Sequence, residues 1–213
     1  MSLLLQVIIN GLIAGSIYAL VASGFSLIYN TNRFMHFAHG VSVVVSGYIL
    51  FTLFTLLKFN FYLALISTLV YSSFIGFLIF RLIYLPLQNR KASNVILLIA
   101  SISILILFQN LVQIIYGANV KDIGFTEIKE GIEIGDLIIT SNQIVILLTS
   151  LIFFVFLFIF MNKTSIGKDM RAVSENKELA SIIGINSKKV SDLSFFIGSF
   201  LGGIAGVLIS FLE

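Results

Sequence analysis

Residues 144–161 read IVILLTSLIFFVFLFIFM, and this uncharged run decides the fold class of the chain. Its length is close to the roughly 20 residues that a helix needs to cross a bilayer. Comparable apolar runs occupy residues 3–29, 41–57, 61–80, 95–116 and 193–212. The chain of 213 residues is 58% hydrophobic and only 11% charged, whereas soluble domains carry about 25% charged residues. We therefore expect an all-α polytopic membrane protein with about six spanning helices.

The first two apolar runs are unusual in length. As a helix, residues 3–29 would reach about 40 Å, so this span must tilt, bend or protrude from the bilayer. Gly11 and Gly15 are natural places for a bend. The second run is short, and it either begins inside the preceding loop or enters the membrane only partway. The N-terminus lacks the basic region of a signal peptide, so we interpret it as the first span.

The basic residues between the runs indicate the orientation of the chain. Segments 30–40, 81–94 and 162–192 carry one, three and six Lys or Arg residues, which together are ten of the thirteen in the chain. Cytoplasmic segments of membrane proteins are enriched in Lys and Arg. We therefore place these three segments in the cytoplasm, with the N-terminus and the end of the sixth span outside.

Residues 117–143 form the longest segment on the outer side, with two basic and five acidic residues. Ile128 and the triplet Ile132-Glu133-Ile134 alternate around Glu130-Gly131, a pattern that resembles a small β-hairpin. Because loops are polar by default, this extracytoplasmic loop is either a cap over the helix ends or a contact surface for an extracytoplasmic partner.

No Asp, Glu, Lys or Arg lies in the middle of an apolar run. Proton pumps and voltage sensors need ionisable residues inside the membrane, so the energy for transport is expected to come from another source. Uncharged polar residues do occur in the runs, where they either line a hydrated path or hydrogen-bond between helices. Our candidates for a translocation path are Asn10, Ser16, Tyr18, His39 and Asn110.

Small residues mark places where helices are expected to pack closely. The spacing Gly-x-x-x-Gly lets helix backbones approach each other. It occurs in the first and last runs, at Gly11, Gly15, Gly198, Gly202 and Gly206.

The chain holds two histidines and no cysteine. On a helix, His36 and His39 would share a face. A metal site needs further ligands, and the sequence offers none nearby. We therefore expect no bound metal and no catalytic residue.

The charged segment 165–186 differs from the apolar runs on either side. It reads as two short helices, with Ser165 as the cap of the first and Asn176 as a favourable N-cap of the second. An apolar stripe follows, and Gly184 can end the second helix as a C′ residue. The stripe consists of Leu179, Ile182 and Ile183. A helix of about two turns is unstable alone, so it must lie against the bilayer interface or in a groove of a cytoplasmic partner.

Five stretches, in this order, resemble the permease subunits of ABC importers for branched-chain amino acids, a family that also includes urea and amide permeases. They are NGLIAGSIYALVASGFSLIYN, HFAHG, YLPLQ, IGKDMRAVSENKELASIIGIN and FFIGSFLGGIAGVL. The resemblance runs over essentially the whole chain, and RAVSENKELASIIGIN is its most specific part. The family usually has Asn where His36 stands. It also continues by roughly two further spanning helices, so we expect this chain to lack the C-terminal part.

The resemblance implies that residues 1–213 are a single permease domain, with 162–192 as a cytoplasmic coupling loop. A coupling helix would dock on cytoplasmic subunits that bind ATP and Mg²⁺, while the chain itself would bind no cofactor. An extracytoplasmic substrate-binding protein would deliver the ligand, and a second permease subunit, identical or a paralogue, would pair with this one in the inner membrane of a prokaryote. The coupling residues would be Arg171, Glu175, Asn176, Glu178, Leu179, Ala180, Ile182, Ile183 and Gly184.

Three other functions are consistent with the sequence. The chain could be a truncated, non-transporting membrane scaffold or assembly subunit, or a permease for urea or amides. An ion-coupled secondary transporter is a third class, which internal inverted repeats would support, although no clear repeat is visible in the sequence.

Overall fold

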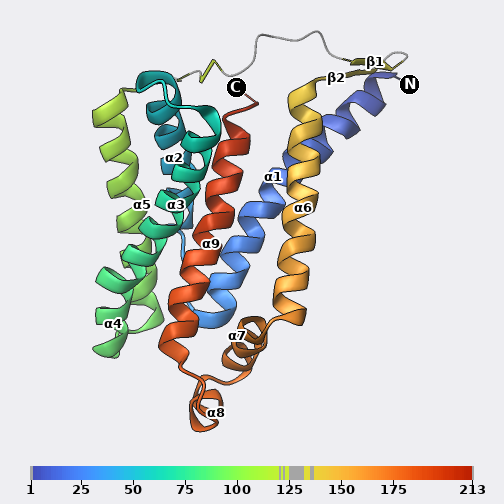
Figure 1. Cartoon of the computed structure of the whole chain (residues 1–213). Helices are drawn as coiled ribbons and strands as arrows, with labels where there is room; N and C mark the ends of the chain where they lie inside the picture. The colour runs from blue at the N-terminus through green and yellow to red at the C-terminus, as the bar shows by residue number, and fades with distance from the viewer. Residues whose placement is uncertain (1, 120, 122, 125–131, 135–136, 213) are drawn as a thin grey trace.

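The computed structural model describes residues 2–119, 121, 123–124, 132–134 and 137–212. It is built from helices, with one short β-hairpin (Figure 1). The helices are α1 (Ser2–Asn32), α2 (His39–Leu50), α3 (Phe61–Ile79), α4 (Leu85–Asn89), α5 (Asn94–Tyr116), α6 (Ser141–Lys163), α7 (Ser165–Glu175), α8 (Lys177–Ile182) and α9 (Ser187–Ile209). Two π-helical turns, Phe51–Leu56 and Phe80–Tyr84, extend α2 and join α3 to α4.

Six helices in the described part of the chain are long and apolar enough to cross a membrane, which confirms the predicted all-α polytopic fold. They are Leu4–Asn32, His39–Leu56, Phe61–Asn89, Asn94–Tyr116, Ser141–Lys163 and Ser187–Ile209.

Two spans differ from the predicted boundaries. The third helix continues to Asn89 through residues expected to form a loop, because Pro86 falls in the first turn of α4, directly after a π-helical turn. A π turn changes the hydrogen-bond register, so a residue without an N–H is accommodated there. The sixth helix begins at Ser187 and not near residue 193, because the Asn186 side chain caps it by accepting from the Lys189 backbone N–H.

Helix α9 lies at the centre of the bundle, with α1, α2 and α3 packed around it (Figure 1). Of its membrane-length stretch 72% is buried, against 11% for α6, which packs at the edge beside α1. In a membrane, apolar side chains gain little by leaving lipid, so small residues that allow close van der Waals contact select the central helix.

The bundle has two ends of different character (Figure 1). The N-terminus, the hairpin and the end of α9 lie at one end, and α4, α7 and α8 lie at the other. The linker between α1 and α2 belongs to the second end, because Arg33 accepts a hydrogen bond at its backbone oxygen from Asn94. The three segments that the sequence assigned to one side of the membrane therefore share one end of the bundle.

The hairpin pairs β1 (Ile132–Ile134) with β2 (Leu137–Ile139). The strands are antiparallel, with Ile132 opposite Ile139. The triplet Ile132-Glu133-Ile134 is thus the first strand of this hairpin, and the expected turn at Glu130-Gly131 stays a prediction. Ile128, Glu130 and Gly131 themselves lie outside the described residues. Gln6 of α1 fixes the hairpin to the bundle through hydrogen bonds with the backbone of Ile138.

Candidate functional site

The segment between α6 and α9 folds as two short helices with a sharp break. Thr164, and not Ser165, caps α7 by accepting from the Gly167 N–H. Asn176 caps α8 by accepting from the N–H groups of Glu178 and Leu179, both at 3.0 Å. Gly184 follows α8 with a φ of +90°, a conformation that side chains with a Cβ rarely adopt. The local signals at Asn176 and Gly184 therefore act as the sequence predicted.

The stripe of α8 stays exposed in this chain. Leu179 is 59% exposed, Ile182 78% and Ile183 73%. By contrast, Ala180 is buried, in a cluster that includes Leu27 and Val190. The helix thus buries a small residue against the bundle and leaves three large apolar side chains exposed, at the extreme end of the molecule (Figure 1). We call these three side chains the α8 tip.

Helix α7 ties the α8 tip to the spanning helices. Its apolar side, Met170 and Val173, is buried in the same cluster as Ala180. The Arg33 side chain donates to the Ser174 carbonyl oxygen, and the Arg171 side chain donates to the Met161 carbonyl oxygen. A displacement of the tip would therefore be transmitted to the ends of α1 and α6. Among the remaining predicted coupling residues, Glu175 and Glu178 are exposed.

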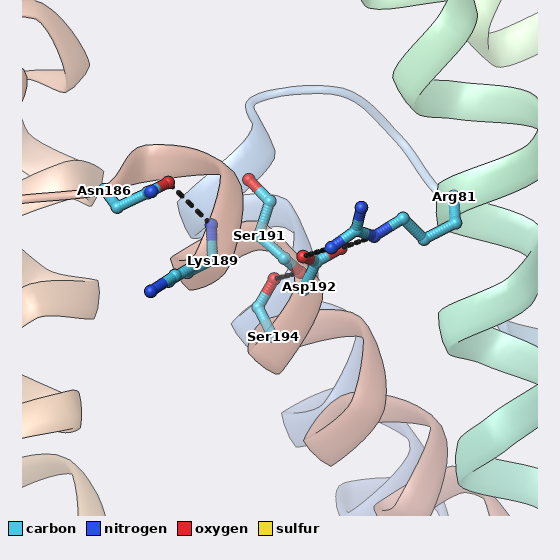
Figure 2. A network of polar contacts seen from close by, with 6 residues as sticks. All are labelled: Arg81, Asn186, Lys189, Ser191, Asp192 and Ser194. Atoms are coloured by element: carbon cyan, nitrogen blue, oxygen red, sulfur yellow. Dashed lines mark hydrogen bonds and ion pairs between the residues drawn. The ribbon is translucent and has the colours of Figure 1, made fainter.

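An ion pair joins α9 to the end of the third spanning helix. Figure 2 shows Arg81 reaching Asp192, with Ser191 and Ser194 beside the carboxylate. The Arg81 guanidinium donates to both carboxylate oxygens, at 2.9 Å and 2.7 Å. Two parallel charge-assisted hydrogen bonds fix the relative position of the two helices. The sequence placed both residues in cytoplasmic segments, but a separation of 111 positions gave no signal that they pair.

The linker between α1 and α2 is held by buried polar contacts. Nδ1 of His36 and the Tyr84 hydroxyl share a hydrogen bond of 2.9 Å, and the Ala38 N–H donates to Ser101 Oγ at 2.9 Å. Burial first, and the neighbouring His39 second, hold the pKa of His36 well below its usual range. His36 is therefore neutral and acts as a structural hydrogen-bonding group. No cluster of three metal-ligating residues occurs in the part of the chain that the structure describes.

The five candidates for a translocation path do not gather at one place. Tyr18 is 70% exposed on the outer side of α1, and Asn110 bonds back to the Ile106 carbonyl of its own helix. Asn10 accepts from Gln143 of α6 at 3.4 Å, and Ser16 donates to the Ile13 carbonyl. A cavity of about 260 Å³ does open between α2 and α9, but none of the five lines it.

His39 lies inside the bundle, where it fills a notch between two glycines. A Cβ built on Gly24 would lie 2.9 Å from the His39 ring, and one on Gly202 would lie 3.0 Å from it. Neither ring nitrogen makes a well-aligned hydrogen bond to a described residue. The ring makes a poorly aligned polar interaction with the backbone of Val21. This histidine of α2 thus packs against both α1 and α9.

The predicted packing glycines fall into two groups. On α9, Gly198 and Gly206 touch α1 and α2, because a Cβ on Gly198 would lie 2.7 Å from Ile28, and a Cβ on Gly206 would overlap Ser46 and the Val43 carbonyl. On α1, no described atom lies within 4 Å of a Cβ built on Gly11 or Gly15. The close contact of α1 is instead made by Gly24, which the Gly-x-x-x-Gly pattern did not include.

Comparison with known proteins assigns the chain to a protein family. Residues 7–212 match the family model described as "Branched-chain amino acid transport system / permease component". The chain belongs to this permease family. No solved structure gives a significant match.

Three relatives illustrate the similarity. The high-affinity branched-chain amino acid transport system permease protein BraD of Pseudomonas aeruginosa is 30% identical, over 96% of this chain and 70% of BraD. The corresponding LivH of Salmonella typhimurium is 31% identical, with the same coverage. A probable branched-chain amino acid transport permease protein LivH of Methanocaldococcus jannaschii is 30% identical, over 98% of this chain and 67% of that protein. The chain is thus a multi-pass membrane permease related to branched-chain amino acid transporters, a group of transport proteins and not of enzymes.

Proposed function

We propose that this chain is the permease subunit of an ABC importer, and that it forms a translocation path for branched-chain or related amino acids. ATP hydrolysis would take place on a separate cytoplasmic subunit that binds ATP and Mg²⁺. An extracytoplasmic binding protein and a second permease subunit would complete the assembly. Family membership supports the transport class, and the names of the relatives support the substrate class.

The α8 tip is the observation that carries the coupling part of the proposal. Three large apolar side chains project from a short, capped helix at the end of the bundle that holds the basic segments. Apolar anchors on one side of a short helix fit a groove of a partner protein. Because α7 links this helix to α1 and α6, a push on the tip would move the spanning helices.

The absence of central charge supports an energy source on another chain. Within the six spans, Arg81 and Asp192 pair with each other near the α8 end, and the other charged residues lie in the terminal turns at that same end: Lys163, Lys188 and Lys189. Coupling to protons or to the membrane potential would require ionisable groups deep in the bundle. The basic segments further support placing the α8 end in the cytoplasm.

Uptake of radiolabelled leucine tests this function. A strain that lacks the gene should lose the ATP-dependent, binding-protein-dependent part of leucine uptake, and the intact gene should restore it. Excess unlabelled isoleucine and valine should compete, whereas urea and acetamide should not. Normal leucine uptake after deletion would contradict the proposal and favour a non-transporting scaffold, and competition by urea alone would favour a urea or amide permease.

A further inference from the structure

A groove of about 510 Å³ with two lysines in its lining lies between α4 and the turn that joins α8 to α9. One wall is the end of the third spanning helix, and the other carries two lysines and two serines. The polar residues that line it are Gln88, Asn89, Lys177, Ser181, Asn186, Ser187 and Lys188. Among the described residues, none that lines the groove is acidic. The groove thus combines two cations and neutral hydrogen-bonding groups with two apolar residues, Leu85 and Ile185.

The two lysines bring like charges together without a counter-charge. Partial burial, and then the positive charge of Lys188, lower the pKa of Lys177 from its usual value. Neither lysine forms an ion pair with a residue that the structure describes. An anion placed between the two ammonium groups would relieve their repulsion and restore the lost solvation.

The neutral groups suit an oxyanion with several acceptor oxygens. Ser181 donates to the Lys177 carbonyl at 2.9 Å, and its hydroxyl lies 3.1 Å from that of Ser187. Because these contacts use the protons of both hydroxyls, the neutral donors left for an anion are side-chain amides, such as those of Gln88 and Asn89 on the opposite wall. A phosphate group accepts hydrogen bonds from such donors and pairs with lysine as a point charge.

The position of the groove along the bundle, near the expected membrane surface, favours a lipid as the source of that phosphate. Its α4 wall is the last turn of a membrane-length helix, Phe61–Asn89, so the groove opens at the level where headgroups meet the helix ends. The α8 tip, which is the surface suited to a protein, lies farther from the membrane and is apolar. Clusters of basic residues directly beside spanning helices recognise anionic headgroups.

We propose that this groove binds the phosphate group of an anionic phospholipid, with Lys177 and Lys188 as its cationic ligands. The inference goes beyond the proposed function and does not depend on it, because binding is measured on the purified chain without transport, an ATPase or a binding protein. A free phosphate ion presents the same chemistry, so the experiment separates the two sources.

Native mass spectrometry of the detergent-purified chain tests the site. We expect phosphatidylglycerol adducts to exceed phosphatidylcholine adducts at equal lipid concentration. In the double variant Lys177→Gln/Lys188→Gln the phosphatidylglycerol adducts should fall by about tenfold, since each basic residue near an anionic surface contributes to binding. Lys177→Arg/Lys188→Arg should keep them. Elution as a single peak from size exclusion shows that each variant is folded.

A matched control removes the same charge elsewhere at this end of the molecule. In Lys163→Gln/Lys189→Gln both residues are exposed, and Lys189 is the sequence neighbour of Lys188 but does not line the groove. This variant should bind phosphatidylglycerol like the wild type. Equal loss in both double variants, or no loss in either, would overturn the proposal.

Two further arms identify the occupant. Suppose that millimolar inorganic phosphate displaces phosphatidylglycerol from the wild type, and that phosphate binds no more weakly when phosphatidylglycerol is absent. The groove would then be assigned to soluble phosphate, with the same two lysines as ligands. If Lys177→Gln/Lys188→Gln instead weakens co-purification of an ATP-binding subunit and leaves lipid adducts unchanged, the groove contacts a protein and the lipid proposal is wrong.

Discussion

At the scale of single residues, a few glycines decide how closely the helices approach. Gly206 has the Val43 carbonyl and the Ser46 hydroxyl in the space where a Cβ would stand, whereas Gly11 has open space. The two glycines have the same helix propensity and lie in spanning helices. Their different surroundings therefore make a clean comparison.

Gly206→Ala should lower the thermal unfolding midpoint of the detergent-purified chain, and Gly11→Ala should leave it unchanged or raise it slightly. Overpacking costs about 1–3 kcal/mol, while Gly to Ala in an open helix gains up to about 1 kcal/mol. A fluorescence thermal-shift assay measures both. Equal midpoints for the two variants would show that the α2–α9 contact is looser than the structure describes.

The sequence predicted the residue-scale features that depend on local chemistry. Asn176 and Gly184 were identified correctly because a cap and a left-handed C′ position are decided by neighbours in the chain. The Arg81–Asp192 pair and the His36–Tyr84 hydrogen bond were not identified, since their partners meet only when separate helices pack. Whether Asn10, Ser16, Tyr18, His39 and Asn110 touch a substrate stays a prediction.

At the scale of elements, α8 is a six-residue helix that depends on its neighbours. Its N-cap satisfies two N–H groups and Ala180 anchors it, but the α8 tip finds no cover in this chain. The two alternatives for its location, bilayer interface or partner groove, differ in what a charged substitution does. If the α8 tip sits in a groove of a partner protein, a charged substitution in the tip would break that apolar contact.

We expect Leu179→Asp/Ile183→Asp to reduce co-purification of the ATP-binding subunit by about tenfold or more, because apolar anchors in a desolvated pocket dominate such interfaces. Lys168→Asp on α7 adds negative charge at the same end without touching the tip, and it should co-purify normally. Undiminished recovery with the tip variant would assign α8 to the membrane surface and contradict the coupling role.

At the scale of the whole molecule, the two ends of the bundle must face opposite sides of the membrane. Asn119 comes three residues after the end of α5, and Ser181 lies on α8, at the opposite end of the bundle from the N-terminus; both residues are exposed. The chain has no cysteine, so a thiol reagent can label only the single cysteine that is introduced.

In intact cells an impermeant thiol reagent should label Asn119→Cys and should label Ser181→Cys only after permeabilisation. The reason is the concentration of Lys and Arg at the α8 end, which favours the cytoplasm. Labelling is read as a mass shift on a gel, with the cysteine-free chain as the blank. The reverse pattern would invert the orientation and remove the basis for coupling through α8.

The sequence by itself determined that this chain is a membrane protein of six spanning helices, with its basic segments at one end and a capped short helix between the last two spans. Those features follow from hydrophobic length, charge and local capping, which need no partner from a distant position. Only the tertiary structure decided that α9 is the central helix, that Gly24 and not Gly11 carries the α1 contact, and that α4 and α8 enclose a groove. These depend on which helix faces meet, and in a membrane nearly every face is apolar, so the pattern of hydrophobicity alone cannot select them.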